Sequence, residues 1–342
     1  MAEMEGPESV RTPGRVWTEF PEDLGEEGEG ELRVEAPDDV EVREAVKPEL
    51  FREADVKNAV TEHHSKLLEE ENTVFVRIPE DTVVEEPIRI DTRIGSGFFP
   101  HHVLVIAGEG SAARVVERNQ GDGRVDSSIT EVIVEEGADL RFERLNELGE
   151  AVGYSDSYAE VGKDARIGWT VMSTGSELYR SSVRTELTGP RSKLDYRLGF
   201  LSSGEQHMDH SSHVIHSADN TRCDMDSRGV ALDSSRAVYK GVQEVKQGAE
   251  GTKSFQDERT VLVGEEAEAD TTPQLRIDNH DVEATHAATT GHVDDEDLFY
   301  MMSRGLREVE AKRELIQGMF DDLLDSDGAE EAIYRNVEES LS

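Results

Sequence analysis

The amino-acid sequence predicts a mainly β protein whose long β body is flanked by helical segments. Three observations support this class. Apolar and polar residues alternate in short runs from Thr73 to Ile277, which is the period of a β-strand. Gly, Asp or Pro interrupts each run. No convincing helical pattern separates the runs, which excludes a nucleotide-binding sheet of alternating strands and helices.

The chain divides into four regions by composition and periodicity. Residues 1–45 are rich in Glu, Asp, Gly and Pro and predict an acidic, partly disordered arm. Residues 46–72 have apolar residues at helical spacing and predict an N-terminal helical segment. Residues 73–292 form the β body. Residues 293–342 return to the helical period and predict a helical tail with a break at 325–328.

The expected strands are short and separated by small turns, such as Gly108–Gly110 and Glu136–Ala138. Two architectures fit: an antiparallel sandwich or barrel, and a β-solenoid in which each coil stacks on the last. The length of the β body and the recurrent turns favour the solenoid. The expected strands cover residues 74–78, 82–84, 88–90, 102–106, 113–116, 128–134, 139–144, 166–172, 182–187, 193–200, 212–216, 224–230, 237–242, 260–263 and 274–277.

The charge of the chain is strongly negative. Its 36 Lys and Arg residues face 76 Asp and Glu residues, giving a formal net charge of −40. Such a field repels nucleic acid and anionic membranes, so neither is an expected partner. It also suits a salt-rich cytoplasm, where screening suppresses self-repulsion. We favour this halophilic interpretation over a dedicated binder of cations or basic proteins.

Cysteine usage and hydropathy indicate a cytoplasmic protein. Cys223 is the only cysteine, so no disulfide forms within the chain, as is usual in a reducing compartment. No run of 18 apolar residues could span a membrane. The acidic N-terminal sequence has no apolar core, so we do not expect a signal peptide.

The segment from Asp281 to Phe320 resembles the C-terminal signature of the SufB and SufD proteins of iron–sulfur cluster assembly. Weaker matches upstream follow in the same order, so that the resemblance covers about residues 45–325. The parts that carry it in the C-terminal segment are His286, Ala288–Gly291, Leu298–Tyr300, Ser303–Gly305 and Gly318–Phe320. The upstream parts are Val74–Ile90, Gln206–Asp209 with His216, Tyr239–Gly241 and Thr272–Leu275.

The resemblance implies a right-handed parallel β-helix with helical terminal regions. It implies a chain that pairs with a SufB- or SufD-type chain, or with itself. It also implies that the C-terminal helical region docks SufC, an ABC-type ATPase. The chain itself has no phosphate-binding loop, because Gly251–Ser254 has the wrong spacing. We therefore expect a non-enzymatic scaffold subunit, with ATP hydrolysis supplied by SufC.

Two positions decide which member of the family the chain resembles. Glu258 falls where SufB has a sulfur-accepting Cys, and Ala287 follows His286 where SufB has Glu. Both departures indicate a SufD-like chain. The alternative is a short archaeal SufB-like chain, in which Cys223 would be a displaced sulfur acceptor.

His286 is the main candidate iron or cluster ligand, because an imidazole can bind Fe(II). The alternative is a histidine that is hydrogen-bonded within the sheet. Cys223 is a second candidate, since Arg222 could lower its pKa, although a lone Cys in a strand is more often a core residue. Glu258 and Glu283 are carboxylate candidates. One Cys cannot hold a cluster alone, so we expect at most a transient cluster that uses ligands from elsewhere.

Four histidines at intervals of three, and an apolar stripe in the tail, are further candidates. In a strand, residues three apart point to opposite faces, so we do not expect these histidines to form a zinc site. They are His207, His210, His213 and His216. The stripe is either packed on the chain itself or a docking surface for SufC. Its candidate docking residues are Phe299, Tyr300, Arg304, Val309, Ile316 and Phe320.

Two functions from other classes compete with the Suf scaffold. One is a β-helix polysaccharide lyase or hydrolase of the secreted type, which needs paired acidic or basic residues on one solenoid face. The other is a structural solenoid without a site. The sequence leaves open whether the chain forms a homodimer or a heterodimer, and whether it holds a cluster stably.

Overall fold

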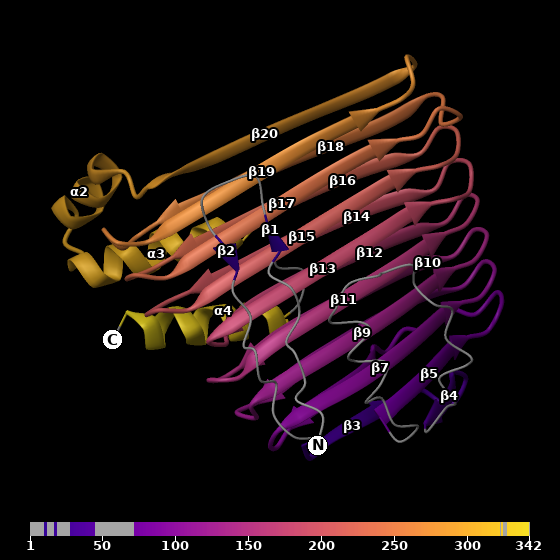
Figure 1. Ribbon diagram of the computed structural model, residues 1–342, viewed down its shortest axis with the longest axis horizontal. Coiled ribbons are helices and arrows are strands. Elements are labelled where there is room, and N and C mark those ends of the chain that lie inside the picture. The colour runs from indigo at the N-terminus through magenta and orange to yellow at the C-terminus, as the bar shows by residue number, and fades with distance from the viewer. Residues whose placement is uncertain are drawn as a thin grey trace.

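The computed structural model describes residues 10–11, 17–18, 28–44, 72–321, 323 and 327–341. Its main body is a flattened parallel β-solenoid (Figure 1). From β5 (Thr73–Ile78) onward, successive strands of the described residues alternate between two nine-stranded sheets, and each strand hydrogen-bonds to the strand two places along the chain. The solenoid prediction is therefore confirmed, and the sandwich or barrel alternative is wrong.

The strands of the solenoid are mostly ten residues long. The first sheet contains β3 (Gly30–Glu35), β6 (Ile88–Ile94), β8 (Ala112–Gly121), β10 (Asp139–Leu148), β12 (Arg166–Gly175), β14 (Lys193–Ser202), β16 (Arg222–Ala231), β18 (Thr252–Leu262) and β20 (Val282–His292). The second contains β4 (Glu41–Glu44), β5 (Thr73–Ile78), β7 (Phe98–Ala107), β9 (Val125–Val134), β11 (Val152–Val161), β13 (Leu178–Leu187), β15 (His207–His216), β17 (Arg236–Val245) and β19 (Glu268–Ile277). A separate hairpin pairs β1 (Val10–Arg11) with β2 (Trp17–Thr18).

The turns at one edge of the solenoid stack on one another as regularly as the strands do. Gly110, Gly137 and Asp164 occupy equivalent turn positions and all have positive φ. The N–H of Gly110 donates to the carbonyl of Glu136, and the N–H of Gly137 donates to that of Lys163, at 2.9 Å each. Gly or a short polar residue tolerates this left-handed backbone, which keeps the turns in register.

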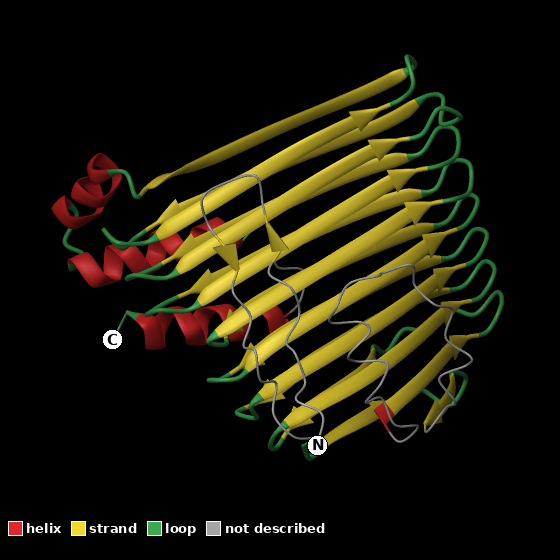
Figure 2. Cartoon of the chain, viewed as in Figure 1, coloured by secondary structure: helices red, strands yellow, loops and turns green. Residues whose placement is uncertain are grey.

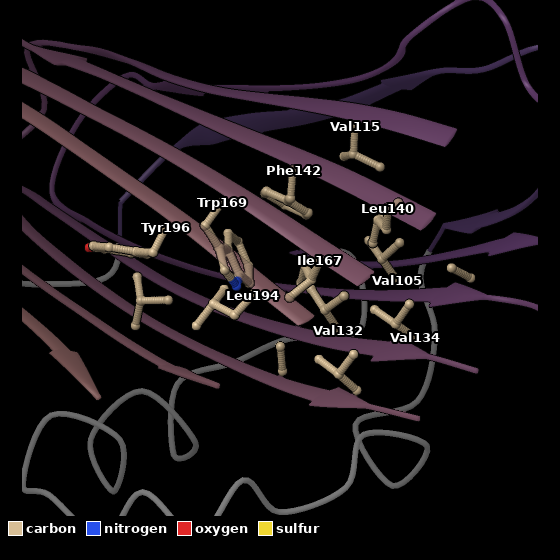
Figure 3. Close-up of a cluster of buried hydrophobic side chains, with 14 of the residues drawn as sticks. Val105, Val115, Val132, Val134, Leu140, Phe142, Ile167, Trp169, Leu194 and Tyr196 are labelled. Atoms are coloured by element: carbon tan, nitrogen blue, oxygen red, sulfur yellow. The ribbon is translucent and has the colours of Figure 1, made fainter. Parts of the chain in front are cut away.

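One half of the solenoid interior is an apolar core. Inward-facing residues at the same register position form columns across the coils, such as Val115, Phe142, Trp169 and Tyr196 (Figure 3). The rings of Phe142 and Trp169 lie 4.7 Å apart. Burying such aromatic side chains is the largest apolar contribution that single residues can make to the core.

The other half of the interior is polar and contains a buried ion pair. Arg144 and Glu117 face each other on neighbouring strands at 2.7 Å, and both side chains are fully buried. Arg144 also donates hydrogen bonds to the hydroxyls of Thr130, Ser155 and Ser157 on the opposite sheet. Its charge is therefore compensated and its donors are used, as a buried guanidinium requires.

The N-terminal end of the solenoid is closed by strands of the expected acidic arm. We expected an arm over residues 1–45, but residues 30–35 and 41–44 form β3 and β4. These strands pair antiparallel with β6 and β5. Leu32 and Val34 pack on the core, so this part of the arm belongs to the solenoid despite its charge.

The described part of the C-terminal tail forms three helices near one edge of the solenoid (Figure 2). They are α2 (Asp295–Ser303), α3 (Glu308–Phe320) and α4 (Asp327–Ser340), so the helical tail is confirmed. No helix in the described part of the chain is long and apolar enough to cross a membrane. The helical segment expected at residues 46–72 lies outside the described residues, apart from residue 72.

Two further strands differ from the sequence prediction. The strand expected at residues 82–84 is reduced to one bridge between Val83 and Ala112. β11 was not predicted, because its inward positions include Ser155 and Ser157 instead of apolar residues. Both serines accept hydrogen bonds from Arg144, so the apolar alternation that marks a half-buried strand is absent there.

Replacing Arg144 with Ala should destabilise the protein by about 3–5 kcal/mol, because Glu117 would stay buried without its partner. Arg141→Ala on the same strand is the control, since Arg141 is exposed, and should change stability by less than about 0.5 kcal/mol. Urea unfolding of both variants measures the difference. If both variants lost the same free energy of unfolding, the buried ion pair would contribute no more to stability than an exposed arginine does.

Candidate functional site

The C-terminal end of the solenoid is open, because no further coil covers β19 and β20 in the described residues. The inward-facing residues of this last coil are therefore exposed or half-exposed, in contrast to their equivalents on β16 and β18. Leu275 and Ile277 are 36% and 41% exposed. We call the inward faces of β19 and β20, with the inward face of β18 behind them, the open end.

The outer edge of β20 has no strand beside it among the residues that the structure describes. In a parallel pair, alternate residues direct their N–H and C=O groups to opposite sides. The N–H of Val293 donates to the carbonyl of Leu262 on β18, so the odd-numbered residues bond to β18. The even-numbered residues of β20, including His286, direct their N–H and C=O groups away from the sheet. On β19, the N–H of Glu268 donates to the carbonyl of Ser235, so even-numbered residues bond to β17. The backbone nitrogen of the odd-numbered Pro273 is directed away from the sheet, and its missing N–H therefore breaks no bond within the sheet.

His286 and Glu258 lie on the same face of neighbouring strands at the open end. His286 pairs with Gln256, and Glu258 pairs with Ala288, in the ladder between β18 and β20. Both side chains therefore point to the inward face, two register positions apart, on strands that are about 4.8 Å apart. His286 is exposed, whereas Glu258 is only 2% exposed.

The carboxyl group of Glu258 is buried with little compensation. A side-chain hydrogen bond from Gln256 favours its charged form, but by less than burial disfavours it. Burial raises the pKa of Glu258 to about 8, since no cation offsets the loss of solvation. The group is therefore neutral at pH 7 and becomes a carboxylate ligand only when it loses its proton.

Cys223 lies in the core two strands behind β20. It is fully buried, between Leu194 and Ser254 in the ladder. Burial raises the pKa of its thiol well above the ordinary value, so the lowered pKa that we expected beside Arg222 is wrong. The guanidinium of Arg222 lies on the outer face and pairs with Asp224 at 2.6 Å.

Glu283 does not join the other candidates. It lies on the outer face of β20 and forms an ion pair with Lys253 at 3.0 Å, with both side chains more than half exposed. The open end thus brings together His286 and Glu258, and separates them from Cys223 and Glu283. No group of three or more His, Cys, Asp or Glu side chains is placed to hold a metal in the part of the chain that the structure describes.

The comparisons with known proteins identify the family. Residues 90–319 match the family model described as the SufBD core domain of SUF system FeS cluster assembly. The chain belongs to the SufBD family. It is 29% identical to the iron–sulfur cluster assembly protein SufD of Bacillus subtilis, over 71% of this chain and 58% of that protein.

Two further SufBD family relatives are similarly distant. The chain is 26% identical to one from Synechocystis, over 73% of this chain and 55% of the relative, and 27% identical to a chloroplastic one from Arabidopsis thaliana, over 75% and 49%. The chain therefore spans about half the length of the curated relatives that it matches. This membership confirms the resemblance and leaves no support for a polysaccharide lyase or hydrolase.

The tail of this SufBD protein exposes four of the six candidate docking residues. Phe299, Tyr300 and Val309 are 73%, 58% and 43% exposed, and the exposed Arg304 lies over the ring of Tyr300 at 5.1 Å. Ile316 and Phe320 are buried against the solenoid instead. The apolar stripe is thus divided between self-packing and an exposed patch.

The four regularly spaced histidines lie in β15, on alternate faces. His207 and His213 point outward, and His213 lies 3.1 Å from Glu244. His210 and His216 point inward, where His210 stacks on Phe200 and His216 bonds to Thr221 and Ser254. They do not converge on one site, as expected for a strand.

Sequence reasoning missed the glutamine pair beside the site. The amide of Gln243 on β17 donates to Gln256 on β18 at 3.1 Å, and to the carbonyl of Thr285 on β20 at 3.3 Å. Gln243 thereby links the second sheet to β18 and to β20, the strand that carries His286. The coil-to-coil register would have placed Gln256 beside His286, but the strand patterns in the sequence do not give that register.

Replacing Glu258 with Gln should reduce the loss of stability at higher pH. The folded state keeps this proton up to about pH 8, whereas the unfolded chain releases it near the ordinary pKa of 4.5. Between these values the folded state binds more protons, so its stability falls by up to about 1.4 kcal/mol per pH unit and then levels off. Urea unfolding at pH 5, 6.5 and 8 measures this slope.

The Glu258→Gln variant cannot titrate at this position, so its slope should be smaller over the same range. Glu283→Gln is the matched control, since Glu283 is exposed, and its slope should equal that of the unmodified protein. If the Glu258→Gln variant and the unmodified protein had the same slope, the carboxyl of Glu258 would not titrate as described.

Proposed function

We propose that this SufBD protein is a SufD-like subunit of the Suf scaffold on which iron–sulfur clusters are assembled. It pairs through its open end with a SufB- or SufD-type chain, and it carries SufC on its helical tail. The observation that carries this proposal is the open end itself, where an uncompleted solenoid presents His286 beside Glu258. The cluster is cargo here, not a resident cofactor.

The open end has the composition of an interface. Its exposed inward face consists of small, apolar or neutral residues, in a chain with a net charge of −40. Like charges would oppose association elsewhere on the surface, but not here. The free N–H and C=O groups along β20 can also pair with a strand of a second chain.

The site supplies too few ligands to hold a cluster alone. His286 offers a nitrogen, and Glu258 offers oxygens once it is deprotonated. The remaining ligands therefore come from the paired chain or from a bound thiol. Cys223 would act as a sulfur acceptor only after a rearrangement that exposes it, because its thiol is fully buried.

The exposed patch on α2 and α3 is the proposed SufC surface. Contiguous exposed apolar residues on a soluble chain mark interaction sites. Here they lie on α2, at the start of α3 and in the connection between the two helices, and they are Phe299, Tyr300, Met302, Leu306 and Val309. The chain contributes no nucleotide site to the proposed complex. Its cytoplasmic and halophilic character stay predictions.

Co-expression with SufC of the same organism should give a complex that survives purification at high salt. The double variant Phe299→Ala and Tyr300→Ala should weaken binding at least about tenfold, because large exposed aromatics dominate such interfaces. Val83→Ala is the control, since Val83 is 68% exposed at the other end of the solenoid. Unchanged binding by the double variant would remove the patch from the proposal.

Anaerobic reconstitution with iron and sulfide, in the presence of the paired chain, tests the open end. His286→Ala should lose or shift the absorption of the assembled cluster, because one nitrogen ligand is removed. His280→Ala, in the exposed turn before β20, should leave the spectrum unchanged. Identical spectra for all three proteins would exclude His286 as a ligand.

A further inference from the structure

The helical tail connects coils that are far apart along the solenoid. It leaves the last strand, β20, and runs back along the edge of the stack (Figure 1). α3 packs beside β16, and α4 packs on β14, β12 and β10. We propose that the tail is a brace that holds the open end against the middle coils, with α4 as its far anchor.

A solenoid needs such a brace at an uncovered end. Each coil contacts only its neighbours, so stability passes from coil to coil. The last coil has a neighbour on one side only and is the part most prone to local opening. Among the described strands, β20 forms its ladder with β18 alone, and most of its residues are exposed. A direct link to distant coils opposes this fraying.

The near part of the brace is the contact between α3 and the first sheet. Ile316 and Phe320 are buried against the outer face of the first sheet. Phe320 lies over Gly199 of β14, where an added Cβ would come within 3.3 Å of the Phe320 ring and 2.3 Å of the Met172 methyl group. The absence of a side chain at Gly199 therefore makes the space that Met172 and Phe320 share.

The far anchor combines apolar burial with an ion pair. Ile333 and Val337 of α4 are fully buried, in one cluster with Leu145, Met172 and Leu201 of the sheet. Between them along the helix, Arg335 pairs with Glu147 at the end of β10. The side chain of Glu147 is only 8% exposed and is also held by Arg118 and by Gln120, at 3.6 and 2.9 Å.

Polar contacts join α3 and α4 into one unit. The hydroxyl of Tyr334 donates to Asp321 at the end of α3, at 2.8 Å. Arg313 of α3 and Glu338 of α4 approach to 3.9 Å. A displacement of α3 is therefore passed to α4 and to the sheet beneath it, and the anchor of α4 restrains α3 and α2.

The functional consequence rests on the proposed function. The brace would keep β20, and with it His286, in register with Glu258 while a partner occupies α2 and α3. A partner that moves these helices would then act on β20 and on the middle coils together, not on a loose tail.

Hydrogen exchange of the full chain, followed by mass spectrometry, tests the brace. The double variant Ile333→Ala and Val337→Ala should raise exchange in β18 and β20 at least about tenfold, and leave β5 and β7 unchanged. The matched control, Val74→Ala and Val76→Ala, removes buried apolar groups from β5. It should raise exchange in β5 and β7 only. Unchanged exchange of β18 and β20 in the tail variant, or an equal rise in the control, would overturn the proposal.

A milder pair of variants keeps the test valid if the double variant fails to fold. Arg335→Ala should raise exchange in β20 about threefold or more, whereas Arg335→Lys keeps the charge and should recover most of the protection. Equal exchange in the Arg335→Ala variant and the unmodified protein would remove Arg335 from the anchor. These readouts need no SufC and no cluster. The brace can therefore fail while SufC binding and cluster assembly succeed, and the reverse.

Discussion

The structure depends on one constraint, the in-register stacking of parallel coils. Every interior strand hydrogen-bonds to the coil before it and the coil after it, and the turns repeat this pattern with their own N–H to carbonyl bonds. A side chain in such a stack is buried only if the next coil is present. The fold therefore creates a last coil whose inward residues are exposed, and it places His286 there.

The same stacking explains how the interior tolerates polar residues. Each inward position lies beside the equivalent position of two other coils and opposite the second sheet, so a polar group finds partners without leaving the core. Glu117, Arg144 and the hydroxyls around them pair in this way. Glu258 lies nearest the open end and has no cation beside it, which is why burial raises its pKa to about 8.

The alternation of apolar and polar residues predicted most of the solenoid strands, because their inward faces are apolar. It failed where the inward face is polar, as in β11, and where acidic composition concealed a strand, as in β3 with Leu32 and Val34. The turns contain the information on register that the strands lack. In them, a residue with a left-handed backbone precedes a small buried residue, as in Gly137-Ala138 and Asp164-Ala165. The pairing of His286 with Gln256 depends on that register, so the strand patterns could not supply it.

The residues at the open end also bear on the choice of partner. His286 and Glu258 offer nitrogen and oxygen, whereas clusters are held mainly by thiolates. A second copy of this chain would add another imidazole and another carboxyl group, but no accessible sulfur, because Cys223 is buried with a raised pKa. A SufB-type chain with an accessible Cys would supply what is missing. If the chain pairs through its open end as proposed, this ligand chemistry favours a heterodimer over a homodimer, a choice that the sequence left open.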